Sequence, residues 1–269
     1  MMLSKILVGI DHSPRSDKAL RRANELALFH DAKLVLDYVI DVGTAQRLRG
    51  LIERVAIEEA DARAKEVLGD TAAPIEVRAS GGRPYEALRD AATELGAGLI
   101  VLGVHRREGS FGGSTARRLI NVAPTPVLVV TDDVAGMYEN VLVGFDRSPA
   151  SYRALRYARE LAPTARITVL TACMIPFSAR KQEATLVKQF EDETRVRVKE
   201  ALGEELANVE LVVRAGEAFG VIRQAVDERK PDLLALGTSM SEAYRFVFGG
   251  GIVDLVAADP PCDLLVTKV

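Results

Sequence analysis

A short stretch near the start of the chain decides the fold because it occurs twice. ILVGIDHSP at residues 6–14 returns as VLVGFDRSP at residues 141–149, an offset of 135 residues. Further along, LIVLG at 99–103 returns as LLALG at 233–237, an offset of 134 residues. Self-similarity at a nearly constant offset indicates two copies of one structural unit.

The length and composition of the chain agree with two units. A chain of 269 residues is long enough for one large domain or two ordinary ones, at roughly 100–200 residues per domain. The repeat places a first domain at residues 1–135 and a second at 136–269. Hydrophobic residues make up 48% of the chain and charged residues 27%, which is typical of a globular protein and excludes a disordered or fibrous one.

Each copy alternates short apolar runs with stretches of helical composition. In the first copy, the apolar runs lie at 3–10, 33–39, 75–79, 98–103 and 127–131. Helices are expected at about 14–29, 44–68, 84–95 and 114–122, and a long helix is expected near 178–202 in the second copy. Nearly continuous Leu, Val and Ile indicate strands that are buried on both faces of a parallel sheet. We predict an α/β fold of two doubly wound, five-stranded parallel-sheet domains in tandem, since the repeat argues against a single eight-stranded barrel.

Charge and hydropathy exclude several classes of partner. The formal net charge is −3 and no long run of Lys and Arg occurs, so we expect neither a nucleic acid nor a membrane as partner. No apolar run approaches the roughly 20 residues that span a bilayer. The opening residues lack the apolar core of a signal peptide, so a cytoplasmic location is expected.

The residues that most often bind metals or form disulfides show no motif. Cys173 and Cys262 have no Cys-x-x-Cys partner, and reduced thiols are expected. His12, His30 and His105 lie far apart with no ligand spacing between them, so no metal site is expected.

Two aspartates lie where such a sheet binds ligands. In an open parallel sheet, the binding crevice lies beyond the carboxyl ends of the strands. The first strand of each copy ends at Asp11 and at Asp146, and a carboxylate there can accept hydrogen bonds from a ribose or a base. Asp11 or Ser13 could instead cap the helix that follows.

A glycine-rich segment follows the fourth strand of the first copy. GSFGGST at residues 109–115 precedes a predicted helix. Glycines let the backbone approach a phosphate, and the amides at a helix start attract an anion. A surface loop with an ordinary Ser or Thr cap is the other interpretation. The segment lacks the Gly-Lys-Ser/Thr ending of a Walker loop.

These residues, in this order, resemble the universal stress protein family. The last strand of the first copy, APTPVLVV at 123–130, is close to that family's Ala-Pro-Cys-Pro-Val-Leu-Val-Val pattern. VGID at 8–11 and DYVID at 37–41 look like its first two strands. The resemblance covers nearly all of both halves and implies a tandem member with a Rossmann-like, adenine-nucleotide alpha-hydrolase-like fold.

The resemblance also implies a site for ATP or another adenine nucleotide. Asp11 would contact the ribose or the base, and Val39 would contact the adenine. The residues expected around the phosphates are Gly103, Arg106, Gly113, Ser114 and Thr115. The corresponding positions of the second half are Asp146, Gly237, Gly250 and Gly251.

Both halves depart from the family's glycine pattern. Arg106 stands at the family's second glycine, only six residues separate it from Gly113, and its guanidinium could replace lost backbone contacts to phosphate. In the second half, Met240 stands at that glycine and Gly251 replaces the Ser or Thr. We therefore expect nucleotide binding in the first half more than in the second.

The leading functional hypothesis is a stress-response protein that binds an adenine nucleotide and acts by binding rather than catalysis. An alternative is a nucleotide-independent scaffold, or a sensor of another small ligand, that works through a protein partner. A slow ATPase or adenylyl-transfer enzyme is the third hypothesis, and His105 is its only candidate base.

The final strand of each sheet should leave an apolar edge that needs protection. As the family resemblance implies, these edges would meet in an internal pseudo-dimer of the two domains, and a homodimer of the whole chain is a further expectation. Separating the halves at about residue 135 should expose both edges and make each half dimerise in analytical ultracentrifugation. Two stable monomeric halves would contradict this expectation.

Overall fold

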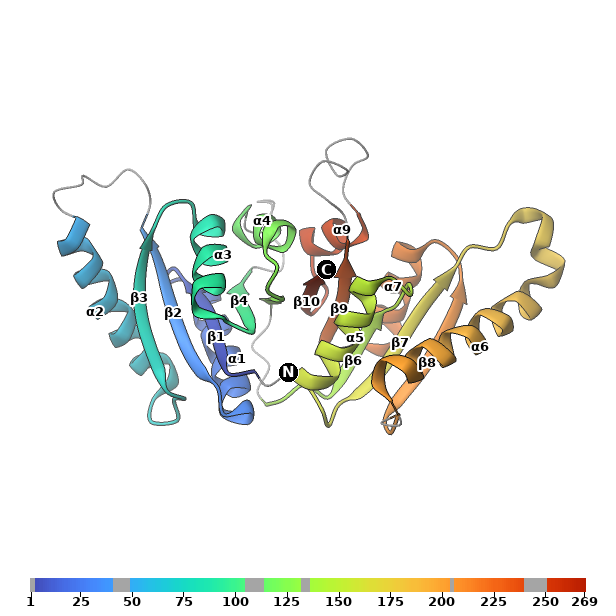
Figure 1. The fold of residues 1–269 in the computed structure, drawn as a ribbon, viewed down its shortest axis with the longest axis horizontal. Helices are drawn as coiled ribbons and strands as arrows, with labels where there is room; N and C mark the ends of the chain where they lie inside the picture. Colours follow the sequence, from blue (N-terminus) through green and yellow to red (C-terminus); the bar gives the residue numbers. More distant parts are fainter. Residues whose placement is uncertain (1–2, 41–48, 105–113, 132–135, 204–205, 240–250) are drawn as a thin grey trace. The chain divides into compact units, whose positions relative to one another are not determined.

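The computed structural model describes residues 3–40, 49–104, 114–131, 136–203, 206–239 and 251–269, within which strands and helices alternate along the chain (Figure 1). The first copy contains β1 (Lys5–Ile10), α1 (Pro14–His30), β2 (Lys33–Ile40), α2 (Arg49–Leu68), β3 (Ile75–Gly81), α3 (Pro84–Leu95), β4 (Leu99–Gly103), α4 (Ser114–Val122) and β5 (Val127–Val130). The second contains β6 (Asn140–Gly144), α5 (Pro149–Leu161), β7 (Arg166–Cys173), the 3-10 helix η1 (Phe177–Gln182), α6 (Glu183–Leu202), β8 (Val209–Ala215), α7 (Ala218–Arg229), β9 (Leu233–Thr238), α9 (Ile252–Ala258) and β10 (Asp263–Lys268).

The strands of the first copy follow the order β3-β2-β1-β4-β5, and those of the second follow β8-β7-β6-β9-β10. Parallel pairing joins β1 to β2 and β4, β2 to β3, and β4 to β5. In the second copy, parallel pairing joins β6 to β7 and β9, and β7 to β8. The strand order therefore reverses at β1 and at β6, which makes these the topological switch points of the two sheets.

The reversal also places helices on both faces of the first sheet. Connections between parallel strands are right-handed in almost all proteins, so helices that precede and follow the reversal cover opposite faces. Accordingly, α1 and α2 contact each other and strands β1 to β3, whereas α3 and α4 contact each other on the other side. Strands β1, β2, β4 and β5 are largely buried between these layers, which explains their nearly continuous apolar sequence, whereas the edge strand β3 is partly exposed and carries charged residues.

The sequence predicted most of these elements correctly, and the doubly wound α/β fold is confirmed. The predicted helix near 178–202 is wrong at its start, because 177–182 form the 3-10 helix η1 and α6 begins only at Glu183. The predicted start of the helix at 44–68 falls outside the described residues. Within the described ranges, no helix is long and apolar enough to cross a membrane.

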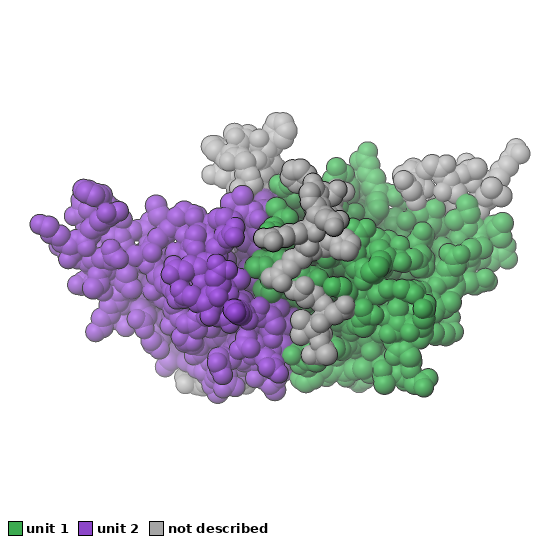
Figure 2. Space-filling model, turned by 180° about the vertical axis from the view of Figure 1, so that it is seen from behind, with its two compact units in different colours: residues 1–137, 258–263 green, residues 138–257, 264–269 purple. Residues whose placement is uncertain are grey.

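The structure divides into two compact units that interleave in sequence. Unit 1 comprises Met1–Met137 and Ala258–Asp263, and unit 2 comprises Tyr138–Ala257 and Leu264–Val269 (Figure 2). The short segment 258–263 therefore belongs with the first copy, although it follows most of the second. The predicted boundary at residue 135 lies outside the described residues and stays a prediction.

A buried ion pair holds this late segment in unit 1. Asp263 is 1% exposed and its Oδ2 lies 3.4 Å from Nε of Arg22, whose side chain is 2% exposed. The Thr131 amide donates to the other carboxylate oxygen, Oδ1, at 2.9 Å. Nη1 of Arg22 also donates to Glu25 at 2.8 Å and to the Gly136 carbonyl at 2.6 Å. The guanidinium therefore links α1 to the residue that opens β10 and to the segment before β6.

Removing the carboxylate should strongly destabilise unit 1. Asp263→Ala leaves the guanidinium of Arg22 buried with one charge partner fewer, which typically costs about 3–5 kcal/mol of unfolding free energy. Glu200→Ala is a matched control, since it breaks an exposed ion pair with Arg197 on α6 and should leave the denaturation midpoint unchanged. Equal midpoints for the two variants in chemical denaturation would refute the importance of the buried pair.

Candidate functional site

The turn between β1 and α1 builds one side of a cavity. The Ser13 amide donates to Oδ1 of Asp11 at 3.1 Å, and the Ser13 hydroxyl donates to the same oxygen. Ser13 in turn caps α1 by accepting a hydrogen bond from the Ser16 amide at 3.4 Å. His12 takes a left-handed conformation, with φ of 57°, which aims the chain from the strand into the helix. Ser13 is thus the cap, and Asp11 orients it.

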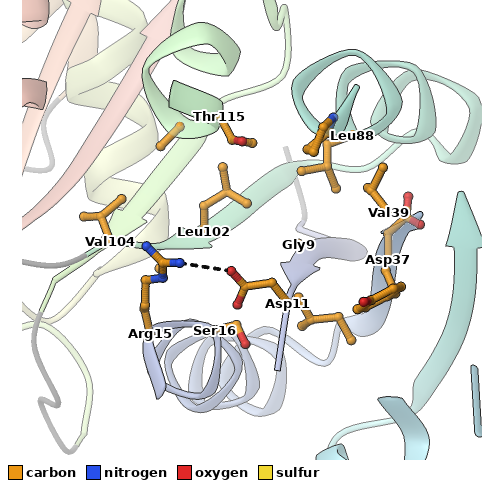
Figure 3. A pocket seen from close by; sticks show the side chains of 15 residues that line it. Gly9, Asp11, Arg15, Ser16, Asp37, Val39, Leu88, Leu102, Val104 and Thr115 are labelled. Atoms are coloured by element: carbon orange, nitrogen blue, oxygen red, sulfur yellow. Dashed lines mark hydrogen bonds and ion pairs between the residues drawn. The ribbon is translucent and has the colours of Figure 1, made fainter. Parts of the chain in front are cut away.

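Asp11 keeps one carboxylate oxygen for other partners. Its Oδ2 lies 3.4 Å from Nη2 of Arg15, and both side chains are partly exposed (Figure 3). Burial raises the pKa of Asp11, but hydrogen bonds from Ser13 and the charge of Arg15 outweigh it, so the pKa lies below its ordinary value. The side chain is therefore an ionised acceptor at neutral pH.

The second copy repeats this turn almost atom for atom. The Ser148 amide donates to Oδ1 of Asp146 at 2.9 Å, and Ser148 caps α5 through the Ser151 amide at 3.2 Å. Arg147 is left-handed, with φ of 67°. Burial raises the pKa of Asp146, but hydrogen bonds from Ser148 more than offset this and keep the pKa low.

A cavity of about 200 Å³ opens at the carboxyl ends of β1, β2 and β4 in the first copy. The first turns of α1, α3 and α4 close it from the sides (Figure 3). Four residues predicted from the sequence line it together: Asp11, Val39, Gly103 and Thr115. The cavity at the switch point is thus lined by residues from three strands and three helices.

Other predicted residues cannot be placed in the site. Arg106 and Gly113 lie outside the described residues, as does Gly250 in the second half. The backbone of Ser114 begins α4, but its side chain is outside the described part.

The cavity also contains residues that the sequence analysis missed. Arg15 reaches it from the first turn of α1, and Asp37 reaches it from the middle of β2 (Figure 3). A signal for Asp37 was available, because a carboxylate interrupts an apolar strand that is buried on both faces. Arg15 gave no comparable signal, since a charged residue in a first helical turn is usually exposed.

The second copy encloses a smaller and more apolar cavity of about 100 Å³, lined by Asp146 and Gly237 among others. Where Arg15 and Thr115 line the first cavity, the repeat places Ala150 and Ile252. Two polar side chains are thereby lost.

A buried carboxylate lies next to the start of α9 in the second half. The Gly251 amide, which the sequence predicts to contact a ligand, donates to Oδ2 of Asp254 at 3.1 Å. Asp254 is only 4% exposed, so its carboxylate stays close to this amide. A phosphate approaching here would meet a negative charge and an amide that is already paired.

Gly103 and Gly237 have a structural role beyond the cavities. A Cβ atom at Gly103 would overlap the carbonyl of Arg15, and one at Gly237 would overlap the backbone of Ala150. In both copies, therefore, a glycine at the end of the fourth strand lets the first turn of the first helix pack directly against it.

Comparison with known proteins places these features in a family. The universal stress protein family model matches residues 2–131 and again residues 137–268. A universal stress protein from Mycolicibacterium smegmatis is 33% identical over 172 residues, which span 57% of this chain and 58% of that relative.

A solved structure shows the same fold over the whole chain. A universal stress protein from Archaeoglobus fulgidus has a TM-score of 0.75 with 17% identity, covering 100% of this chain and 99% of its own. A universal stress protein crystallised in complex with cAMP is 28% identical, with a TM-score of 0.39, and covers 49% of this chain and 98% of its own.

Adding a methyl group at Gly103 or Gly237, where the strand packs directly against the backbone of the first helix, should destabilise the fold. Gly103→Ala and Gly237→Ala each force backbone atoms apart, at a typical overpacking cost of about 1–3 kcal/mol. Gly50→Ala is the matched control, because a Cβ at Gly50 meets nothing within 4 Å and alanine favours a helix over glycine by about 0.5–1 kcal/mol. Denaturation midpoints that fall equally in all three variants would contradict the close-approach argument.

Proposed function

This chain belongs to the universal stress protein family, and we propose that it binds one adenine nucleotide in its first half and acts by binding rather than by catalysis. The observation that supports this most directly is the first cavity, which joins an ionised Asp11 at the end of β1 to Thr115 at the start of α4. An acceptor at one side and helix amides at the other suit the two chemically different ends of a nucleotide.

The β1 and β2 side of the cavity suits a nucleoside. Oδ2 of Asp11 faces only the guanidinium of Arg15 among its close described partners, so it can accept a hydrogen bond from a ribose hydroxyl. Val39 and Leu88 supply apolar surface on the same side (Figure 3). A flat base can pack against such side chains while the ribose meets the carboxylate.

The α4 side of the cavity suits phosphates. The first amides of α4 have no partner within the helix, and the helix dipole favours an anion near them. The hydroxyl of Thr115 adds a donor, and Arg15 adds a positive charge that is 37% exposed. Arginine pairs well with phosphate because its planar group offers several donors.

The second half lacks these features. Ile252 stands at the position of Thr115 and Ala150 at that of Arg15, and Asp254 places a carboxylate beside the Gly251 amide. We therefore assign the nucleotide to the first half alone. In this proposal the second half contributes through the pairing of domains or through a protein partner in the stress response.

Binding without turnover completes the proposal. Among the described residues lining the first cavity, the carboxylates are Asp11 and Asp37, which we assign to the ribose and the base, and no histidine, lysine or cysteine lies beside the proposed phosphate position. Sustained release of ADP from ATP is therefore not expected, and its detection in a coupled assay would favour the slow ATPase instead.

Matched aspartate variants test the assignment. Titration calorimetry of the full chain with ATP should find about one nucleotide per chain. Asp11→Ala removes a charged acceptor and should weaken binding by about 1.5–3 kcal/mol, whereas Asp146→Ala causes the same local loss in the second half and should leave the affinity unchanged.

Two results would overturn this proposal. Equal weakening by both variants would show that the halves bind alike. Absence of binding by the unaltered chain would favour the nucleotide-independent scaffold.

A further inference from the structure

Asp37 is a buried carboxylate in the wall of the first cavity. It lies in the middle of β2, opposite Gly9 of β1 and Arg78 of β3, and its side chain is 0% exposed. Residues two apart on a strand share a face, so Asp37 lies beside Val39, as Figure 3 shows. The carboxylate therefore belongs to the part of the cavity that suits a base.

Only one of its two carboxylate oxygens has a hydrogen-bond partner among the described residues. The Ser80 hydroxyl donates to Oδ2 at 2.8 Å, and Nε of Arg78 lies 3.7 Å from the same oxygen. Oδ1 is buried and accepts no hydrogen bond from any residue that the structure describes. Burial raises the pKa of Asp37, and the hydrogen bond from Ser80 and the charge of Arg78 only partly offset it. An unpaired polar atom inside a protein is costly and needs a reason.

The second copy shows that the fold does not need this carboxylate. β6 pairs with β7 so that Gly144 lies opposite Leu170, which is the same position that Asp37 takes opposite Gly9. The apolar Leu170 thus takes this position in the wall of the second cavity. The carboxylate is specific to the larger, more polar cavity.

We propose that Asp37 is a specificity-determining residue, whose Oδ1 accepts a hydrogen bond from the exocyclic amino group of the base. This inference rests on the proposed nucleotide site and adds the selection of the base. Adenine carries an amino group at position 6, whereas a 6-oxo purine carries a carbonyl oxygen there. The carboxylate attracts the first group and repels the second.

A pair of nucleotides that differ at position 6 tests the proposal. In titrations of the full chain, ATP should bind at least about tenfold more tightly than inosine triphosphate, as expected for a hydrogen bond to a charged group. In Asp37→Asn, the side-chain oxygen can still accept from Ser80 while its amide group faces the base and donates. The preference for ATP should therefore disappear or invert.

The ratio of the two affinities makes the test independent of folding. Any loss of folded protein affects both nucleotides equally, and so does a general weakening of the site. Asp90→Asn is the matched control, because Asp90 lies on the exposed side of α3 in the same unit and pairs with Arg89. This variant should keep the wild-type ratio.

Each outcome decides between the claims. Equal affinities in the wild type, or an unchanged ratio in Asp37→Asn, would overturn the role of Asp37 while leaving nucleotide binding in place. If neither nucleotide binds the wild-type chain, the proposed nucleotide site itself is wrong, and the base selection falls with it.

Discussion

The architecture of each half depends on one close contact, in which the end of the fourth strand lies directly against the first turn of the first helix. Gly103 and Gly237 have no room for a Cβ because the backbone of Arg15 or Ala150 occupies that space. This contact keeps the start of the helix at the point where the strand order reverses. The capping serine, the aspartate that holds it and the mouth of the cavity all follow from that placement, in both copies.

The sequence predicted the elements well because local pattern determines them. Apolar runs, prolines at helix starts and the internal repeat are all readable without tertiary contacts. Asp11, Val39, Gly103 and Thr115 were identified by position and do lie together. The sequence showed a carboxylate at Asp37 in an apolar strand, but its surroundings depend on distant pairings, because they form only when β1 and β3 flank β2. The 3-10 helix before α6 was missed because its composition is also that of an α-helix.

The two halves of the chain allow side chains at matching positions of the same fold to be compared. The strand order and the capped turn are the same, so differences between the cavities arise from side chains at matching positions. Arg15 and Thr115 of the first half are replaced by Ala150 and Ile252 in the second. The second half also has Asp254 beside the start of its last helix. The same fold thus holds two cavities whose lining differs in charge and polarity.

The interleaving of the two units has a consequence for the order in which the protein folds during translation. Domains usually fold as they leave the ribosome, the first before the second. Here unit 1 includes residues 258–263, which are synthesised only after nearly all of unit 2. The ion pair between Arg22 and Asp263 can form only after more than two hundred further residues have been synthesised. The first half of the nascent chain therefore lacks six residues of its compact unit, and the acidic partner of a buried arginine, until translation is almost complete.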